Sequence, residues 1–367
     1  MKVSTLLGVR KAAYKRRYRK ILLLHLLRCT IKERNYLTVA SLCDPTNSAW
    51  QRLYNEGHPG SFVAAVSLPP ASFKVLLAEF SKLYKLKWRP GRQGRPPKLR
   101  FLHAVLGCVL HFYTSAVEMK TLCEIFGVPP ATLSNILATA EVALELALNA
   151  LPDAAIRYPT NNTQLEWSKA VQAHEPLVSG VWGFVDGKNY RVQEPSDVDL
   201  QNAHYNGWLH SVLITGTLCY GCDGTLIWAK LNCPGSWNDG EMSFALQEKL
   251  ADVRITVPGT GVAADTAFPV SKGTRGRIVT PLKDGDLECA PERCRLGMLA
   301  MSNAITSLRQ AAEWGMGSAP RCYRQLQLPL PFDPVKRGRR IQNIYRLYNF
   351  RVRQTGISQI RSVFMHK

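Results

Sequence analysis

The stretch Val181-Trp-Gly-Phe-Val-Asp-Gly187 runs from apolar and aromatic residues into an acidic residue and a glycine. A short apolar run that ends in turn residues predicts a buried strand. Val262-Ala-Ala-Asp265 repeats this form further along the chain. We therefore expect two strands that end beside Asp186 and Asp265, each with a carboxylate at its end.

Further elements are expected around these two strands. The predicted strands are residues 180–192, 209–220, 225–233 and 260–264, and the predicted helices are 237–250 and 296–314. Cys222-Asp-Gly224 joins two of the strands and contains a strong hairpin signal. Glu313 lies near the end of the last helix. This order predicts an RNase H-like α/β domain over residues 171–367.

Asp186, Asp265 and Glu313 fit the chemistry of phosphodiester cleavage. That reaction needs an activated water and a neutralised leaving oxygen, and two Mg²⁺ or Mn²⁺ ions roughly 4 Å apart can supply both. Because Mg²⁺ prefers carboxylate oxygens, the three acids would be catalytic residues and metal ligands, with Asp186 bridging both ions. Taken singly, an Asp before Gly is also typical of a turn, and an isolated Glu in a helix is usually a surface residue. The order and spacing of the three acids together favour a catalytic set over these separate explanations.

Asp239, in Pro234-Gly-Ser-Trp-Asn-Asp-Gly240, is an alternative second ligand. It stands where a loop opens a helix, and capping of the helix N-terminus also explains an acid there. It could equally support the site without touching the metal. We prefer Asp265 because it follows a strand. A zinc site is less favoured, because Cys219-Tyr-Gly-Cys222 has no well-spaced second pair.

Helical spacing dominates the region before the sheet. Residues 71–86 and 99–150 predict helices, whereas residues 40–70, rich in Pro, Gly and Asn, are expected to be irregular. Within residues 119–137, a helix, a turn at Gly127 and a second helix that begins at proline follow helix-turn-helix order. An ordinary helical hairpin is the alternative. The predicted DNA contacts of the second helix are Thr132, Ser134 and Asn135.

The net charge of +20 is concentrated in three segments. Residues 1–35 hold eleven Lys and Arg with one Glu, residues 82–100 hold eight with no acid, and residues 336–367 hold nine with no acid. Localised basic segments around a more acidic core favour double-stranded DNA as the partner over charge spread for solubility. The expected parts are a basic N-terminal helical arm and linker (1–98), a helix-turn-helix-like DNA-binding region (99–170) and the nuclease domain with a basic tail (171–367).

Two basic segments contain further predicted DNA contacts. In residues 89–98, Gly94-Arg95-Pro96 resembles half of a minor-groove hook, although a flexible basic linker is the simpler interpretation. Residues 345–361 interleave aromatic and basic residues, which fits contact with a DNA backbone and also a closing helix packed by its apolar side. The predicted contacts are Arg92, Arg95, Lys98, Arg351 and Arg353.

Residues 9–34 predict a basic amphipathic helix, either a DNA arm or nuclear address, or a helix packed by its leucine side. No secretory signal is convincing and no apolar run reaches about 18 residues, so no membrane partner is expected. Ten scattered cysteines predict free thiols in a reducing, intracellular compartment. With the basic segments, this favours the nucleus.

Four blocks together resemble the successive motifs of Harbinger-type DDE transposases and of nucleases derived from them. They are Gly183-Phe-Val-Asp-Gly-Lys188, Tyr205-Asn-Gly-Trp-Leu-His210, Asp223-Gly-Thr-Leu-Ile227 and Pro234-Gly-Ser-Trp-Asn-Asp239. The resemblance covers about residues 100–365. The chain departs from the common family pattern at Ala264-Asp-Thr-Ala-Phe268 and at Glu313-Trp-Gly-Met-Gly317, where both acids are nevertheless present.

The resemblance implies an RNase H-like catalytic domain with two divalent ions, Mg²⁺ or Mn²⁺, and Asp186, Asp265 and Glu313 as the catalytic triad. Water would cut DNA at the end of a transposable element, and the freed 3′-OH would attack target DNA. The resemblance also implies a separate Myb-like DNA-binding partner protein, and we expect a homo-oligomer on DNA. The alternative is a domesticated, catalytically silent DNA-binding protein derived from a transposase.

Overall fold

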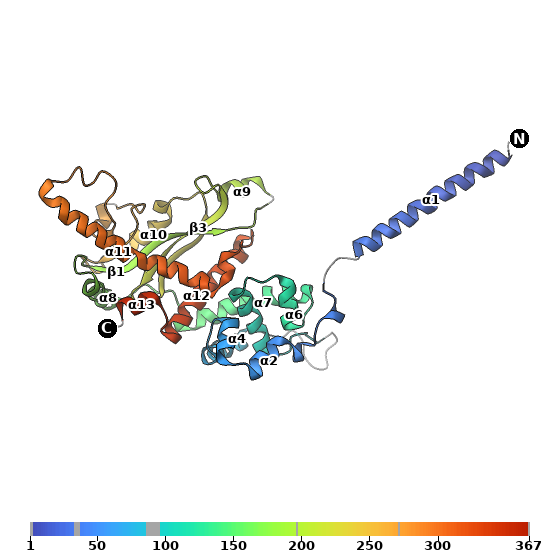
Figure 1. Ribbon diagram of the computed structural model, residues 1–367, viewed down its shortest axis with the longest axis horizontal. Coiled ribbons are helices and arrows are strands. Elements are labelled where there is room, and N and C mark those ends of the chain that lie inside the picture. The colour runs from blue at the N-terminus through green and yellow to red at the C-terminus, as the bar shows by residue number, and fades with distance from the viewer. Residues whose placement is uncertain (1–2, 33–36, 86–95, 196, 271, 366–367) are drawn as a thin grey trace.

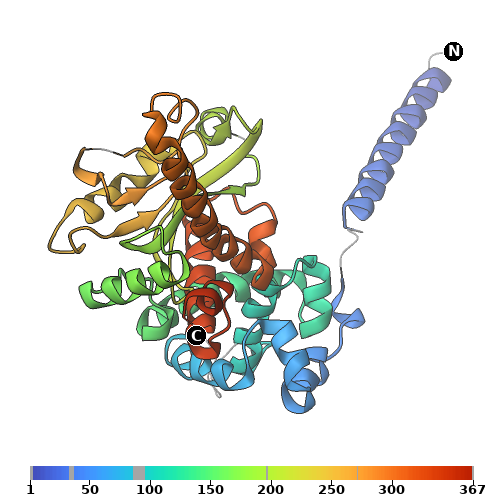
Figure 2. The ribbon, with the colours of Figure 1, turned by 60° about the vertical axis from the view of Figure 1, so that its left-hand side comes forward.

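The computed structural model is shown in Figures 1 and 2, and it describes residues 3–32, 37–85, 96–195, 197–270 and 272–365. Along the chain it has a long N-terminal helix, then a cluster of helices, then a mixed α/β region built on one sheet. The mixed α/β class predicted from the sequence is confirmed.

The N-terminal helix α1 (Val3–Lys32) stands apart from the other described elements in both views. All side chains of residues 14–30 are exposed, including the leucines among residues 21–27. These residues are almost all apolar and cover nearly two helical turns, so they surround the helix instead of forming a stripe. The helix is therefore confirmed, whereas its predicted amphipathic pattern, and the packing of its leucine side on the body, are wrong.

The helical cluster begins earlier than the sequence predicts. Its helices are α2 (Ala49–Glu56), α3 (Pro59–Val66), α4 (Pro70–Leu83), α5 (Leu102–Thr114), α6 (Met119–Phe126) and α7 (Pro130–Ala150). Irregular structure over residues 40–70 is thus a wrong expectation. Ser48 caps α2 by accepting a hydrogen bond from the backbone N–H of Gln51, and Pro59 stands in the first turn of α3, where proline is tolerated. Trp50 of α2 is buried in the core.

The turn between α6 and α7 requires glycine. Gly127 has a φ of 67°, and a Cβ there would lie 2.4 Å from the carbonyl oxygen of Cys43. The predicted helix, glycine turn and second helix are therefore present, and the second helix begins at Pro130. By length and composition alone α7 could cross a membrane, but half of its apolar window is buried inside the fold.

One sheet forms the base of the α/β region. Its strands are β1 (Val181–Arg191), β2 (Tyr205–Asn206), β3 (Ser211–Gly221), β4 (Leu226–Pro234), β5 (Gly261–Ala263) and β6 (Ile278–Val279). The order is β2-β3-β1-β5-β6, with β4 also paired to β3. β1 runs antiparallel to β3 and parallel to β5. The four predicted strands are present, and β2 and β6, with two residues each, are too short to have a periodic signal.

Helices surround the sheet. They are α8 (Asn161–His174), α9 (Val198–His204), α10 (Asp239–Ala251), α11 (Glu292–Cys322), α12 (Pro334–Thr355) and α13 (Gln359–Phe364). Helix α11 lies across β1, β3 and β5 (Figure 1). Gly315 permits this close approach, because a Cβ there would lie 2.8 Å from the ring of Tyr220 on β3. The element that carries Glu313 is thereby held directly on the sheet.

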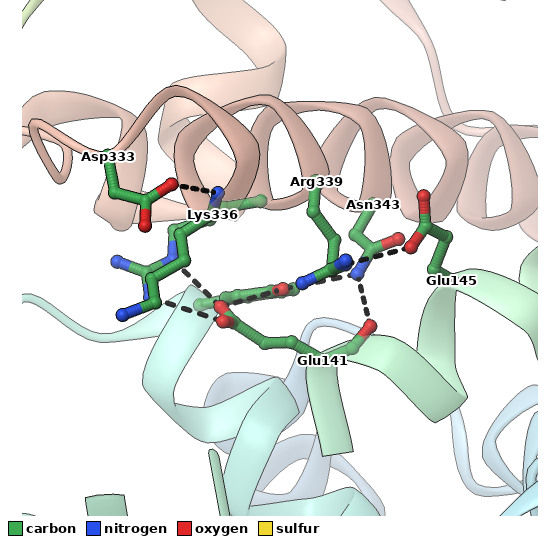
Figure 3. Close-up of polar contacts among 8 residues, drawn as sticks. Glu141, Glu145, Asp333, Lys336, Arg339 and Asn343 are labelled. Carbon is green, nitrogen blue, oxygen red and sulfur yellow. Dashed lines mark hydrogen bonds and ion pairs between the residues drawn. The ribbon is translucent and has the colours of Figure 1, made fainter. Parts of the chain in front are cut away.

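Helix α12 contacts both the helical cluster and the sheet, lying against α7 and β4. Glu141 of α7 is buried and accepts a hydrogen bond of 2.8 Å from Arg340, while its neighbour Glu145 pairs with Arg339 at 2.8 Å (Figure 3). The side-chain amide of Asn343 donates to the backbone carbonyl of Glu141. The closing-helix interpretation of the tail is confirmed, and several of its arginines contact other parts of the protein.

Candidate active site

Asp186 lies inside β1, in agreement with the strand predicted over residues 180–192, and the expectation of a strand end beside it is wrong. The strand continues to Arg191 because β3 supplies backbone partners as far as Leu213. The Asp186 carboxylate accepts a hydrogen bond of 2.7 Å from the backbone N–H of Gly187. Its side chain is 19% exposed. The carboxylate is therefore partly withdrawn from water and has a fixed orientation.

Asp265 lies beside Asp186 because of the sheet register. β5 is the parallel neighbour of β1, and Phe184 pairs with Ala263. Each acid stands two residues beyond this pair, so both are at the same level of the sheet. Asp265 follows the strand end as predicted, and it accepts a hydrogen bond of 2.7 Å from the backbone N–H of Thr266.

Helix α11 brings Glu313 to the same place, together with a cation that the sequence analysis missed. Arg309 lies one turn before Glu313, and its Nη2 is 3.2 Å from the Glu313 carboxylate. Its Nη1 is 3.9 Å from the Asp186 carboxylate on β1. The guanidinium therefore lies between an acid of the sheet and an acid of the helix.

Burial raises the pKa of Asp186 to about 6. The hydrogen bond from Gly187 and the charge of Arg309 act in the opposite direction, whereas the charges of Asp265 and Glu313 raise the pKa further. A carboxylate that senses two other carboxylates belongs to one electrostatic cluster. Asp265 at the end of β5 and Glu313 on α11 therefore lie near enough to Asp186 for their charges to act on it.

The chemistry of this donor set fits a hard divalent cation, since Mg²⁺ prefers carboxylate oxygens. The distances between these acids do not fit a bound ion. Among the described side chains, no three His, Cys, Asp or Glu residues lie close enough together to hold a metal ion. The guanidinium of Arg309 lies between two of the acids. All ten cysteines are free thiols, and Cys219 and Cys222 are buried.

Comparison with protein families supplies independent evidence. The model of the DDE superfamily endonuclease family matches residues 185–349, from β1 into α12. Over these residues the chain is similar to the DDE superfamily endonucleases. Comparison with curated proteins and with solved structures gives no match. The matched segment, called the DDE endonuclease region below, contains Asp186, Asp265, Arg309 and Glu313.

Asp239, the alternative ligand, is also in the DDE endonuclease region. It is the first residue of α10, and its side chain lies outside the described part of the structure. The helix cap is its neighbour Asn238, whose side chain accepts from the backbone N–H of Glu241 while Glu241 accepts from the N–H of Asn238. The capping explanation offered for Asp239 is therefore wrong, because Asn238 performs that role.

The predicted DNA contacts before the DDE endonuclease region are only partly described. Arg92 and Arg95 lie outside the described residues, and Lys98 is half-buried. In the first turns of α7, Ser134 and Asn135 are exposed and Thr132 is half-buried. Their contact with DNA stays a prediction.

Arg353, at the end of α12, contacts the protein itself. Its Nη1 donates to the backbone carbonyls of Asp153 and Ala155 at 2.8 and 2.7 Å, and burial lowers its pKa. Arg351 is half-buried on the same helix. The guanidinium of Arg353 thus links α12 to residues 153–155, before α8. Contact of Arg351 and Arg353 with DNA stays a prediction.

Arg309 is the site residue that the sequence analysis did not identify. The available signal was its spacing from Glu313, because residues four apart on a helix are neighbours and form ion pairs. Such pairs are usually surface features. The contact with Asp186 depends on how α11 crosses β1, which no local pattern specifies.

Proposed function

We propose that this chain is a DNA endonuclease of the transposase type that requires Mg²⁺ or Mn²⁺. The proposal is supported by the placement of Asp186, Asp265 and Glu313 on two parallel strands and a crossing helix, in the segment that matches the DDE superfamily endonucleases. DDE superfamily endonucleases generally use divalent metals, and the family implies a DNA substrate.

We assign Asp186, Asp265 and Glu313 as the residues that would hold two divalent ions. Such ions, when bound, activate water and neutralise the leaving oxygen. The buried setting of Asp186 and its hydrogen bond from Gly187 would orient one carboxylate without rearrangement. Water would attack the phosphodiester and displace its 3′ oxygen, which leaves a 3′-OH and a 5′-phosphate. That 3′-OH would attack a phosphodiester of target DNA and displace the 3′ oxygen there, so that no covalent link to the protein forms.

The DNA would be held by cations outside the site. The exposed residues 14–20 of α1 include Lys15, Arg16 and Arg17, which suit contact with phosphates. The exposed polar residues of α7 extend the same function in a helix-turn-helix-like region. The proposal includes an RNase H-like topology, which the strand order supports. It also includes a homo-oligomer on DNA, a Myb-like partner protein and a nuclear location.

The test is nicking of supercoiled plasmid by purified protein with Mg²⁺ or Mn²⁺. Asp186→Asn keeps the shape of the side chain and removes its charge, and Asp199→Asn, at an exposed position of α9, is the matched control. We expect metal-dependent nicking by the wild type and by the control, and a loss of at least about a hundredfold in Asp186→Asn. Equal nicking by all three proteins would contradict the assignment.

A second function, a catalytically silent DNA-binding protein, is favoured by one observation: Arg309 already neutralises part of the acidic cluster. In that case the wild type would bind DNA tightly and in a salt-sensitive way but cut nothing. Repeating the assay with a co-expressed Myb-like protein separates silence from dependence on a partner.

A further inference from the structure

We propose that Arg309 is a built-in counter-ion of the acidic cluster, which a divalent metal must displace from between Asp186 and Glu313. This inference rests on the proposed function, since it concerns the same site. It adds a residue that neither the acidic motifs nor the family match assigns: a cation of the protein that competes with the metal.

The geometry of the guanidinium supports this role. Nη1 faces Asp186 at 3.9 Å and Nη2 faces Glu313 at 3.2 Å, so one planar group bridges two elements. Arginine can do this because its terminal nitrogens form a rigid fork, whereas lysine presents one point charge. Arg309 and Asp186 are 24% and 19% exposed, so water screens their contact incompletely, whereas Glu313 is 51% exposed and its contact is screened more.

The charges explain why a counter-ion is present. Asp186, Asp265 and Glu313 lie in one electrostatic cluster, and Arg309 acts on Asp186 from among them. With no cation nearby, three ionised carboxylates around a partly buried centre repel one another. Arg309 reduces this repulsion in the metal-free protein. A divalent ion at the same position makes the arginine redundant there, and the two cations would repel each other.

Opposite effects on stability and metal affinity follow. Removing the guanidinium leaves the acids uncompensated, so the metal-free protein becomes less stable. The same change leaves a more negative site with no competing cation, so a divalent ion binds more tightly. An arginine that merely joins α11 to β1 would give the first effect without the second.

The experiment is Mn²⁺ binding by isothermal titration calorimetry, with melting temperatures measured in EDTA and in Mn²⁺. The variants are Arg309→Gln and Arg309→Lys, and Arg321→Gln, exposed near the end of the same helix, is the matched control. For Arg309→Gln we expect affinity for Mn²⁺ to rise about tenfold, with a lower melting temperature in EDTA and a larger gain on adding Mn²⁺. Arg309→Lys should be intermediate and carries the test if Arg309→Gln fails to fold.

The outcomes separate this inference from the proposed function. If the wild type binds Mn²⁺, Asp186→Asn abolishes binding, and both Arg309 variants bind with wild-type or weaker affinity, the counter-ion role is overturned while the metal site stands. If no variant binds Mn²⁺, both the counter-ion role and the metal-dependent nuclease are overturned. Tighter binding in Arg321→Gln as well would reduce the effect to general electrostatics and would also overturn it.

Discussion

At the scale of single residues, burial raises the pKa of Asp186 from its ordinary value of 3.8 to about 6. Between these two values the folded protein binds more protons than the unfolded chain, so stability falls as pH rises through this window. At neutral pH the ionised carboxylate therefore destabilises the metal-free protein. This cost is consistent with a group kept for binding a cation and not for holding the fold.

Asp186→Asn should therefore stabilise the metal-free protein. At about pH 7.5 in EDTA we expect a gain of about 1–3 kcal/mol in the free energy of unfolding, which shrinks towards pH 4 as the wild-type carboxyl becomes protonated. Denaturant unfolding at several pH values measures this. A variant less stable than the wild type at neutral pH would show that Asp186 instead supports the fold.

Gly315 is the second residue with a specific requirement, because α11 touches the ring of Tyr220 there. Gly315→Ala should cost about 1–3 kcal/mol, since the added methyl must move the helix or the ring. Gly317→Ala, on the same helix with no atom within 4 Å of its added Cβ, is the control and should be neutral or stabilising. Thermal and urea unfolding compare the two, and equal effects would contradict the close contact.

At the scale of elements, α12 is joined to α7 by two ion pairs of unequal burial (Figure 3). The Glu141 side chain is 6% exposed and that of its partner Arg340 is 14% exposed, whereas the Glu145–Arg339 pair is 29% and 24% exposed. Tyr113 also donates to Glu141. Removing one partner of a buried pair leaves an uncompensated charge, and this penalty grows with burial.

We therefore expect Glu141→Gln to lower the free energy of unfolding by about 3 kcal/mol or more. Glu145→Gln should cost about 1 kcal/mol or less, because water screens that pair better. Urea denaturation of the two variants gives the comparison directly. A larger loss for Glu145→Gln would mean that burial does not govern these contacts.

At the scale of the whole molecule, the basic charge divides into two kinds. Arg339, Arg340 and Arg353 bind acids or carbonyls of the protein, whereas the described cations of α1 are exposed. A cation already held by protein groups gains little from a phosphate. The net charge of +20 therefore overstates the charge available to DNA.

Replacing five exposed cations of α1 with glutamine should weaken DNA binding and reduce the slope of log K against log salt by up to about 4.5, because each phosphate contact contributes about 0.9. The five are Lys15, Arg16, Arg17, Arg19 and Lys20. Arg353→Gln should lower stability and leave the slope unchanged. Fluorescence anisotropy with duplex DNA at several salt concentrations tests this, and the reverse pattern would place the DNA on α12.

The sequence alone determined the mixed α/β class and the main strands, and it predicted which acids form the candidate site. Apolar runs with local turn signals specify strands. Asp or Glu at the ends of such runs favours chemistry that uses carboxylates, such as the binding of Mg²⁺. The same local signals misjudged residues 40–70, where Pro59 starts a helix instead of breaking one. The apolar run by itself suggested a strand end at Asp186, whereas the strand predicted over residues 180–192 matches β1, whose length depends on pairing with β3.

Tertiary structure alone decided what surrounds the acids. The register of β1 with β5 places Asp186 and Asp265 next to each other, and Gly315 allows α11 to pack closely against the sheet. Only this crossing brings Arg309 between acids of different elements. The physical reason is that these contacts join residues far apart in the chain, and their energy depends on burial and distance, which no short stretch of sequence encodes.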